Sequence, residues 1–269
     1  MKSFGRNDAR GQGALAGRLI LVTGASSGIG YGTARRLAQV EGARVVAVAR
    51  RRVFRIEALA AQVREQTGED RLFPLTTDMA DRAQAEEVVR QVEEQFGRLD
   101  GFIHAVNRAL HLTALEVSDH EFDLTMQVNV KSALYGVQAV APTLRRAGAG
   151  GIVIYNPTPR ETAGFVAAEA VYAAAAHALS ALTAGWTRQL DGSGVGVREV
   201  APAPEGDGAE ASTLGRRSGV VTHDSLLVSA LHETLSAPAA APPAPKAALP
   251  QFRPPQTLRS HGGLVLKEF

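Results

Sequence analysis

The 269-residue sequence contains no cysteine, and this absence removes several classes of function at once. Without thiols the chain has no disulfide framework, no cysteine nucleophile and no cysteine-ligated metal centre. Aromatic residues are scarce: they make up 5% of the chain and include one tryptophan. Neither charge dominates, because 29 basic and 27 acidic residues leave a formal net charge of +2. This balance gives no reason to expect a nucleic acid or a membrane as a partner.

Long hydrophobic runs are missing as well. The longest weakly polar stretch, Ala163 to Gly185, is rich in alanine and contains Glu169 and His177. Such a segment predicts a buried helix rather than a membrane-spanning one. Residues 1–16 are polar and glycine-rich and lack the apolar core of a secretory signal. We therefore expect a cytoplasmic protein with a substantial core, since 45% of its residues are hydrophobic.

The stretch that organises the chain is Leu19–Gly30, with the sequence LILVTGASSGIG. An apolar run of strand length meets a glycine-rich turn, and a helical pattern over 31–40 follows at once. Glycines let the backbone turn sharply and approach a phosphate, while the free N–H groups at a helix start attract negative charge. A second apolar strand pattern, Val45–Ala49, follows one helix later. This order is the context that a dinucleotide-binding site requires.

Strand and helix patterns alternate through residues 17–236, which we expect to form one domain. Because the strands are nearly all apolar, they predict a parallel sheet with helices on both faces, the doubly wound α/β arrangement of a Rossmann-type fold. Asp81 with Gln84 and Ser118 with Glu121 have capping-box spacing, so a helix should begin at each pair. The expected strands lie within 19–23, 44–49, 72–77, 101–105, 151–155 and 195–200, and the expected helices cover 31–40, 53–67, 81–96, 118–146, 168–190 and 224–235.

Outside this domain the regular patterns fade. Residues 1–16 predict a flexible N-terminal arm. Residues 237–250 carry five prolines among alanines, which excludes a helix or a central strand and predicts a linker. The C-terminal segment 251–269 contains one candidate edge strand, at 263–267.

The end of the second strand indicates which dinucleotide the chain prefers. In dinucleotide-binding folds an acidic residue at this point bonds the adenosine ribose and disfavours a 2′-phosphate. Here the strand runs into Arg50, and no acid is present. Arginine pairs with phosphate in a bidentate way, and Ser26 offers a hydroxyl donor to the same group. We therefore expect NADP(H) in preference to NAD(H), and no metal.

The segment Thr23–Gly30 resembles the cofactor loop of the short-chain dehydrogenases/reductases, and the resemblance continues to about residue 202. It implies an NADP(H)-dependent oxidoreductase that acts on a small carbonyl or alcohol, and a homodimer or tetramer paired through the fourth and fifth helices. A family aspartate after the third strand meets the adenine ring, and Asp78 matches it. The implied cofactor-binding residues are Gly24, Ser26, Ser27, Gly28, Ile29, Gly30, Arg50, Asp78, Met79 and Asn107.

Two of the family's catalytic positions are retained. The run Gln127–Lys131 matches the family's asparagine motif, so the resemblance implies that Asn129 holds a helix kink and an ordered water. Tyr172 stands in the frame of the tyrosine that gives or takes the substrate proton. The family's lysine, four residues later, lowers the pKa of that tyrosine, but position 176 is alanine. Glu169, three residues before Tyr172, would instead raise the phenol pKa.

The third catalytic position, a serine after the fifth strand, has no clear equivalent. Depending on which landmark is aligned, it falls on Pro157, Pro159 or Glu161. Thr158 is the hydroxyl nearest to these positions, and two prolines flank it. The residues that grip the adenosine end are thus intact, while those that position the nicotinamide and the substrate have changed.

Three hypotheses follow from this asymmetry. The first is an atypical NADP(H)-dependent oxidoreductase with Tyr172 as the proton donor, since a neutral phenol needs no lysine to act as an acid. The second is a non-redox enzyme that dehydrates, isomerises or cyclises a metabolite. The third is a non-catalytic NADP(H)-binding subunit, paired with an active relative in a mixed oligomer. The candidate acids and bases for the second hypothesis are Tyr155, Arg160, Glu161, Tyr172 and His104.

Overall fold

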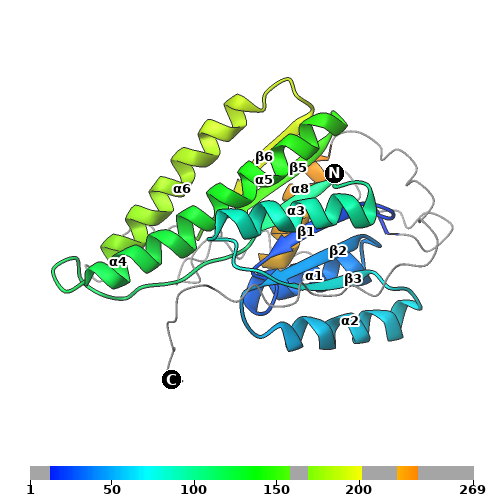
Figure 1. The fold of residues 1–269 in the computed structure, drawn as a ribbon, viewed down its shortest axis with the longest axis horizontal. Coiled ribbons are helices and arrows are strands. Elements are labelled where there is room, and N and C mark those ends of the chain that lie inside the picture. The colour runs from blue at the N-terminus through cyan, green and yellow to red at the C-terminus, as the bar shows by residue number, and fades with distance from the viewer. Residues whose placement is uncertain (1–12, 158–168, 202–222, 236–269) are drawn as a thin grey trace, which may run out of the picture.

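The computed structural model describes residues 13–157, 169–201 and 223–235, in which parallel strands alternate with helices (Figure 1). The sheet has six strands in the order β3-β2-β1-β4-β5-β6, so the Rossmann-type prediction is confirmed. The strands are β1 (Leu19–Thr23), β2 (Arg44–Ala49), β3 (Leu72–Thr76), β4 (Gly101–His104), β5 (Gly150–Tyr155) and β6 (Val195–Val200). The helical segments are α1 (Gly28–Gln39), α2 (Val53–Thr67), α3 (Arg82–Phe96), α4 (Asp119–Met126), η1 (Gln127–Lys131), α5 (Ser132–Ala147), α6 (Ala170–Gln189) and α8 (His223–Thr234).

Helices cover both faces of the sheet, and the side chains of β1 show how each face is filled. Leu19 and Leu21 point into a core shared with α3, α5 and α6, whereas Ile20 and Val22 point into a core shared with α1, α2 and α8. Because both alternating sets are buried, the strand is apolar throughout. Figure 1 shows α3, α5 and α6 on one side of the sheet and α1 and α2 on the other.

The strand order reverses between β1 and β4. The chain runs outward through β2 and β3 and then returns to the other side of β1. In open parallel sheets, ligands bind beyond the carboxyl ends of the strands at such a switch point. Thr23, the last residue of β1, is paired in register with Val48 and His104 of the neighbouring strands, which sets the floor of this crevice.

The main correction to the predicted elements concerns the helix expected over 118–146. It begins at Asp119 as predicted but divides into α4, a five-residue π-helical turn η1 and α5. The Ser118 hydroxyl accepts a hydrogen bond from the Glu121 N–H, whereas the Glu121 carboxylate turns to Arg108 instead of closing the capping box. The candidate strand at 263–267 and the proline-rich stretch lie outside the described residues.

Other boundaries differ from the prediction by one or a few residues. β3 ends at Thr76, β4 ends at His104, β5 begins at Gly150 and α6 begins at Ala170. Asp81 caps α3 through the Gln84 N–H, but the Gln84 side chain accepts from the Asp78 N–H rather than completing a box with Asp81. Within the described ranges, no helix combines the length and apolar character needed to cross a membrane.

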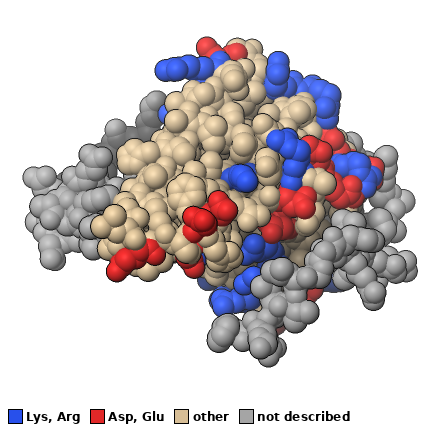
Figure 2. Space-filling view, turned by 60° about the vertical axis from the view of Figure 1, so that its left-hand side comes forward, with Lys and Arg blue, Asp and Glu red and all other residues tan. Residues whose placement is uncertain are grey.

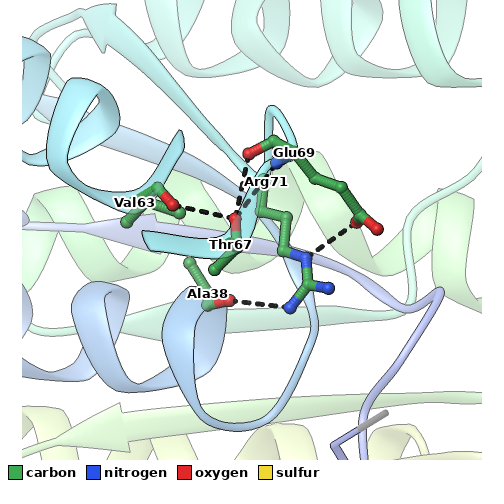
Figure 3. A network of polar contacts seen from close by, with 5 residues as sticks. All are labelled: Ala38, Val63, Thr67, Glu69 and Arg71. Atoms are coloured by element: carbon green, nitrogen blue, oxygen red, sulfur yellow. Dashed lines mark hydrogen bonds and ion pairs between the residues drawn. The ribbon is translucent and has the colours of Figure 1, made fainter. Parts of the chain in front are cut away.

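A polar network at the end of α2 ties the chain before β3 to the end of α1 (Figure 3). The Thr67 hydroxyl donates to the Val63 carbonyl over 2.8 Å, as in the last turn of a helix. Arg71 then donates through Nε to the Glu69 carboxylate at 2.9 Å and through a terminal nitrogen to the Ala38 carbonyl at 3.4 Å. These bonds join the chain before β3 to the end of α1.

Candidate active site

A cavity of about 380 Å³ lies at the carboxyl ends of the strands, at the switch point of the sheet. Nine of the ten predicted cofactor-binding residues line it, and the tenth, Gly30, lies directly beneath. The cavity reaches from Arg50 and Asp78 at one end to Asn107, Ser132 and Tyr155 at the other. We call these the adenosine end and the reaction end, after the predicted orientation of a dinucleotide.

Two glycines of the loop are required by close backbone approach. Gly24 has a φ of +72°, and a methyl group placed there would lie 2.5 Å from the Ala105 carbonyl oxygen. A methyl group at Gly30 would lie 2.4 Å from the carbonyl oxygen of Gly24. Any side chain at either position would push the loop away from β4 and distort the start of α1.

The start of α1 is open toward the cavity. Ser27 is the N-cap residue, with an extended backbone, yet its side chain forms no capping hydrogen bond. Ser26, Ser27 and Gly28 all line the cavity. The N–H groups of the first helical turn therefore lack the usual side-chain acceptor, and a phosphate placed there would satisfy them. These residues fit the pyrophosphate of a dinucleotide.

At the adenosine end, Arg50 is paired with Asp78 at 3.3 Å. The arginine side chain is 41% exposed and the carboxylate 29% exposed, so both remain accessible to a ligand. The other carboxylate oxygen of Asp78 accepts from the Ala80 N–H at 3.0 Å, which fixes the turn after β3. The structure thus places the predicted cation and the predicted adenine contact side by side.

At the reaction end, the Tyr172 hydroxyl already has two partners. It donates to the Pro157 carbonyl at 2.9 Å and accepts from the Asn107 side-chain amide at 3.0 Å. Burial raises the pKa of Tyr172, and the Tyr155 and Glu169 charges raise it further, against a lowering by the Asn107 hydrogen bond. The phenol is therefore neutral at physiological pH, as the missing lysine predicts.

The position of the family's lysine has only a narrow crevice beside it. Ala176 is buried on α6 and borders a crevice too narrow for a water molecule, together with Tyr172, Asn107, Asn129 and Leu179. Alanine at this position thus borders a narrow crevice and supplies no cation to Tyr172.

Asn129 lies in η1, where the resemblance placed a helix kink. Its side chain accepts from the Arg108 N–H at 2.7 Å and donates to the Arg108 carbonyl at 2.9 Å. The Arg108 guanidinium in turn donates to Thr125 and Glu121. Asn129 thus fastens the segment after β4 to the π-helical turn, which supports the walls of the reaction end.

His104, one of the candidate acids or bases of the non-redox hypothesis, is not available to a ligand. It is fully buried, and burial lowers its pKa to about 3. The Ser132 hydroxyl donates to the Val128 carbonyl at 2.5 Å, so it accepts from Nε2 of the histidine, 3.2 Å away. Nδ1 then accepts from the Thr23 hydroxyl at 3.0 Å. His104 is a neutral structural link between β1, β4 and α5.

Sequence reasoning missed Asn156, the residue after β5. Its side chain is almost fully buried, and its Nδ2 lies 2.9 Å from the Ala176 carbonyl and 2.8 Å from the Glu199 carboxylate. Ser180 also donates to Glu199. The only signal was the misalignment of the loop that begins here. Thr158, Arg160 and Glu161, which were predicted as site residues or alternatives, lie outside the described residues.

Comparisons with known proteins identify the family of the chain. A family model described as short chain dehydrogenase matches residues 18–206. An uncharacterized oxidoreductase from Staphylococcus aureus (strain MW2) is 30% identical over 190 residues, covering 70% of this chain and 78% of that protein. The A-factor type gamma-butyrolactone 1′-reductase (1S-forming) of Streptomyces virginiae is 34% identical over 197 residues, covering 71% of this chain and 73% of the reductase.

The crystal structure of a metagenomic short-chain oxidoreductase in complex with NADP has the same fold. It superposes with a TM-score of 0.70 at 24% identity and covers 83% of this chain and 93% of that one. The loop Thr23–Gly30, the parallel sheet and the matched family model agree along the same part of the chain. The protein is a member of the short-chain dehydrogenase/reductase family, which comprises oxidoreductases that bind NAD(P).

Proposed function

We propose that this protein is an NADP(H)-dependent oxidoreductase that reduces a small carbonyl metabolite, with Tyr172 as the proton donor. The observation that carries the proposal is the cavity itself. It combines an uncapped helix start for a pyrophosphate with an exposed Arg50 where a 2′-phosphate would lie, and the strand before Arg50 ends without an acid. NAD(H) lacks that phosphate, so Arg50 would gain nothing from it.

Two relatives support the choice of reaction and cofactor. The Streptomyces virginiae protein is named as a reductase of an A-factor type gamma-butyrolactone, and the metagenomic oxidoreductase was crystallised with NADP. A carbonyl group on a small metabolite is therefore the substrate class that we propose here. Ser26 and Arg50 would contact the 2′-phosphate, Ser27 to Gly30 the pyrophosphate, and Asp78 and Met79 the adenine.

The chain's own part in the reaction concerns the proton. When bound, NADPH would supply the hydride for the carbonyl carbon and would thereby be oxidised to NADP⁺. Tyr172 gives its proton to the carbonyl oxygen, which becomes the alcohol hydroxyl, and solvent returns a proton to the phenolate. The hydroxyl hydrogen of Tyr172 rotates about the C–O bond, and a substrate oxygen would replace Pro157 as its acceptor once the crevice, which is too narrow for a water molecule in this structure, widens toward the cavity. Asn107 donates to Tyr172 in both states and stabilises the transient phenolate.

The absence of the lysine favours reduction over oxidation. Reduction requires a neutral phenol, and the raised pKa of Tyr172 keeps it neutral. Oxidation of an alcohol requires the phenolate, which is rare when the pKa lies above its usual value near 10. The proposal therefore predicts an enzyme biased toward reduction at neutral pH.

The test is NADPH consumption with a panel of small ketones and aldehydes. We expect turnover with at least one of them and a loss of at least a hundredfold in Tyr172→Phe, as for removal of a general acid. Turnover that survives unchanged in Tyr172→Phe would remove this residue from the mechanism. Conversion of a substrate without any change in nicotinamide absorbance would favour the non-redox alternative instead.

A second candidate function is an NADP(H)-binding subunit without hydride transfer. The narrow crevice beside Ala176 favours it, because no lysine is present there and the space does not admit even a water molecule. Such a subunit would bind NADPH, consume none with any carbonyl, and co-purify with an active relative from its host.

The outer face of α6 is the surface that we propose for pairing between chains. Ala174, Ala181 and Ala184 are exposed along it, and small side chains let two helices approach closely. Figure 2 shows a broad uncharged area on the face turned toward the viewer, with charged groups mostly around it. Sedimentation of the purified protein would distinguish a homodimer or tetramer from a monomer, and Ala181→Glu should dissociate the pair.

A further inference from the structure

Tyr155 ends β5 and faces the larger cavity, whereas Tyr172 does not. The cavity is lined at its reaction end by Tyr155, Asn107 and Ser132, and Tyr172 borders only the narrow crevice behind. The alternation of strand side chains explains this placement. Asn156 turns to α6, so the preceding residue, Tyr155, turns to the opposite face and packs on the core shared by α1 and α8.

The two phenols also differ in what their hydroxyls contact. Tyr172 has a donor and an acceptor partner, as described above. Within the described residues the Tyr155 hydroxyl forms no hydrogen bond, and it is not among the side-chain atoms that are sealed from solvent without a partner. A phenolic O–H that faces a cavity and has no protein acceptor is available to a ligand.

The two phenols lie close to one another. Both border the narrow crevice, and Tyr172 donates to the carbonyl of Pro157, two residues after Tyr155. Burial raises the pKa of both phenols, so each hydroxyl keeps its proton at neutral pH and can act as a donor. A carbonyl oxygen bound at the reaction end of the cavity can therefore contact Tyr155, which lines both the cavity and the crevice.

We propose that Tyr155 is a second catalytic residue, whose hydroxyl donates a hydrogen bond to the substrate carbonyl oxygen while Tyr172 delivers the proton. The inference rests on the proposed function and specifies its substrate as a ketone or aldehyde whose oxygen accepts two phenolic donors. Tyr155 keeps its proton throughout. Its contribution is to stabilise the negative charge that develops on the oxygen, which is the role of a preorganised donor in a water-poor site.

The first test uses binding and needs no turnover. The chain has four tyrosines, so protein labelled with ¹³C at the tyrosine ζ carbon gives four NMR signals, each assignable with a Tyr→Phe variant. We expect NADP⁺ to shift the Tyr155 signal and adenosine 2′,5′-bisphosphate, which lacks the nicotinamide half, to leave it in place. Tyr135, on α5 against Arg82, serves as the internal reference. The inference would be overturned if NADP⁺ left the chemical shift of the Tyr155 signal unchanged, or if both ligands shifted it equally.

The second test uses kinetics with a carbonyl that the wild-type protein reduces. Tyr155→Phe keeps the ring and removes the donor, so kcat/KM should fall by about 10- to 100-fold while NADPH affinity changes less than about twofold. Tyr135→Phe is the matched control and should leave both unchanged. Wild-type kcat/KM in Tyr155→Phe, together with a large loss in Tyr172→Phe, would overturn the inference and leave the proposed function standing. A wild-type protein that reduces no carbonyl would overturn both.

Discussion

The two ends of the cavity rest on the same parallel strands, but they are built from different kinds of contact. The adenosine end consists of one continuous loop, Thr23–Gly30, and of residues that directly follow β2 and β3. The reaction end combines side chains from η1, β5 and α6 with the segment after β4. The first is held by local backbone geometry, the second by tertiary packing. This difference explains how one end keeps the family pattern while the other has changed.

The same contrast appears in what each end offers a ligand. Around Ser27 the N–H groups of a helix start have no side-chain acceptor, and Arg50 is accessible. Around Tyr172 the hydrogen bonds are already made within the protein, and the space beside Ala176 is closed. A ligand therefore finds open donors at the adenosine end, and at the reaction end it finds Tyr155.

The largest effect should come from breaking the adenosine end at Gly24. Gly24→Ala combines a positive φ with a methyl group 2.5 Å from a backbone oxygen, so the loop must move. We expect NADPH affinity to fall by more than about a hundredfold and unfolding to become easier by about 3 kcal/mol. Gly68→Ala is the matched control, because its φ is +73° but nothing lies within 4 Å of the added methyl. It should cost about 1 kcal/mol and leave binding intact.

Restoring the family's lysine at the reaction end should destabilise the folded protein. Ala176→Lys places a charged side chain in a buried position beside a crevice too narrow for a water molecule, so we expect a loss of about 3 kcal/mol in the free energy of unfolding. In thermal denaturation this corresponds to a fall of roughly 6–12 °C in Tm. Ala61→Lys, at an exposed position of α2, should change Tm by less than about 2 °C. Equal effects of the two variants would contradict the closed packing described here.

The stability of the strand ends beneath the two ends of the cavity should depend on pH through His104. Its pKa is about 3 in the folded protein, against about 6.5 when unfolded. Below pH 6.5 the His104 side chain is protonated in the unfolded chain but stays neutral in the folded protein. The free energy of unfolding therefore falls as the pH falls toward 3. Between pH 7 and pH 5 the expected loss is about 2 kcal/mol in urea denaturation. His104→Asn should remove this component, whereas His120→Asn, on the exposed surface of α4, should keep it.

Arg50 should contribute to the preference for NADP(H) over NAD(H). Arg50→Ala removes the cation for a 2′-phosphate, and we expect NADPH affinity to fall about tenfold, or about 1.5 kcal/mol. The loss is modest because Asp78 competes for the same guanidinium. NADH affinity should hardly change. Arg64→Ala, which removes an exposed arginine on α2, should affect neither. An equal loss of affinity for NADPH and NADH would instead show that Arg50 contacts a part of the cofactor that both dinucleotides share.

The loop and the strand ends were predictable because their geometry is local. The glycine spacing after β1 and the in-register pairing of parallel strands bring Gly24, Arg50 and Asp78 to one sheet edge without reference to the rest of the chain. The doubly wound sheet followed from apolar strands separated by helices. One local prediction was wrong: residues 118–146 were expected to form one helix because their apolar spacing is continuous. A five-residue π-helical turn does not interrupt that spacing, so the sequence pattern could not predict it.

The reaction end was not predictable in detail because its contacts join distant segments. Asn156 reaches Ala176 and Glu199, which are 20 and 43 residues away in sequence. His104 was predicted as a candidate acid or base, and only its complete burial excludes that role. Tyr155 was named among several candidates, but its place in the cavity depends on which way Asn156 turns. Side-chain direction at a strand end is decided by tertiary partners, not by the local pattern.

The central claim is that the adenosine end carries most of the binding and selects NADP(H). Isothermal titration with NADPH, NADH and adenosine 2′,5′-bisphosphate tests it directly. The account predicts that NADPH binds at least about tenfold more tightly than NADH, and that the bisphosphate retains more than half of the NADPH binding free energy. Equal affinities for NADPH and NADH, or a bisphosphate that does not bind, would contradict it.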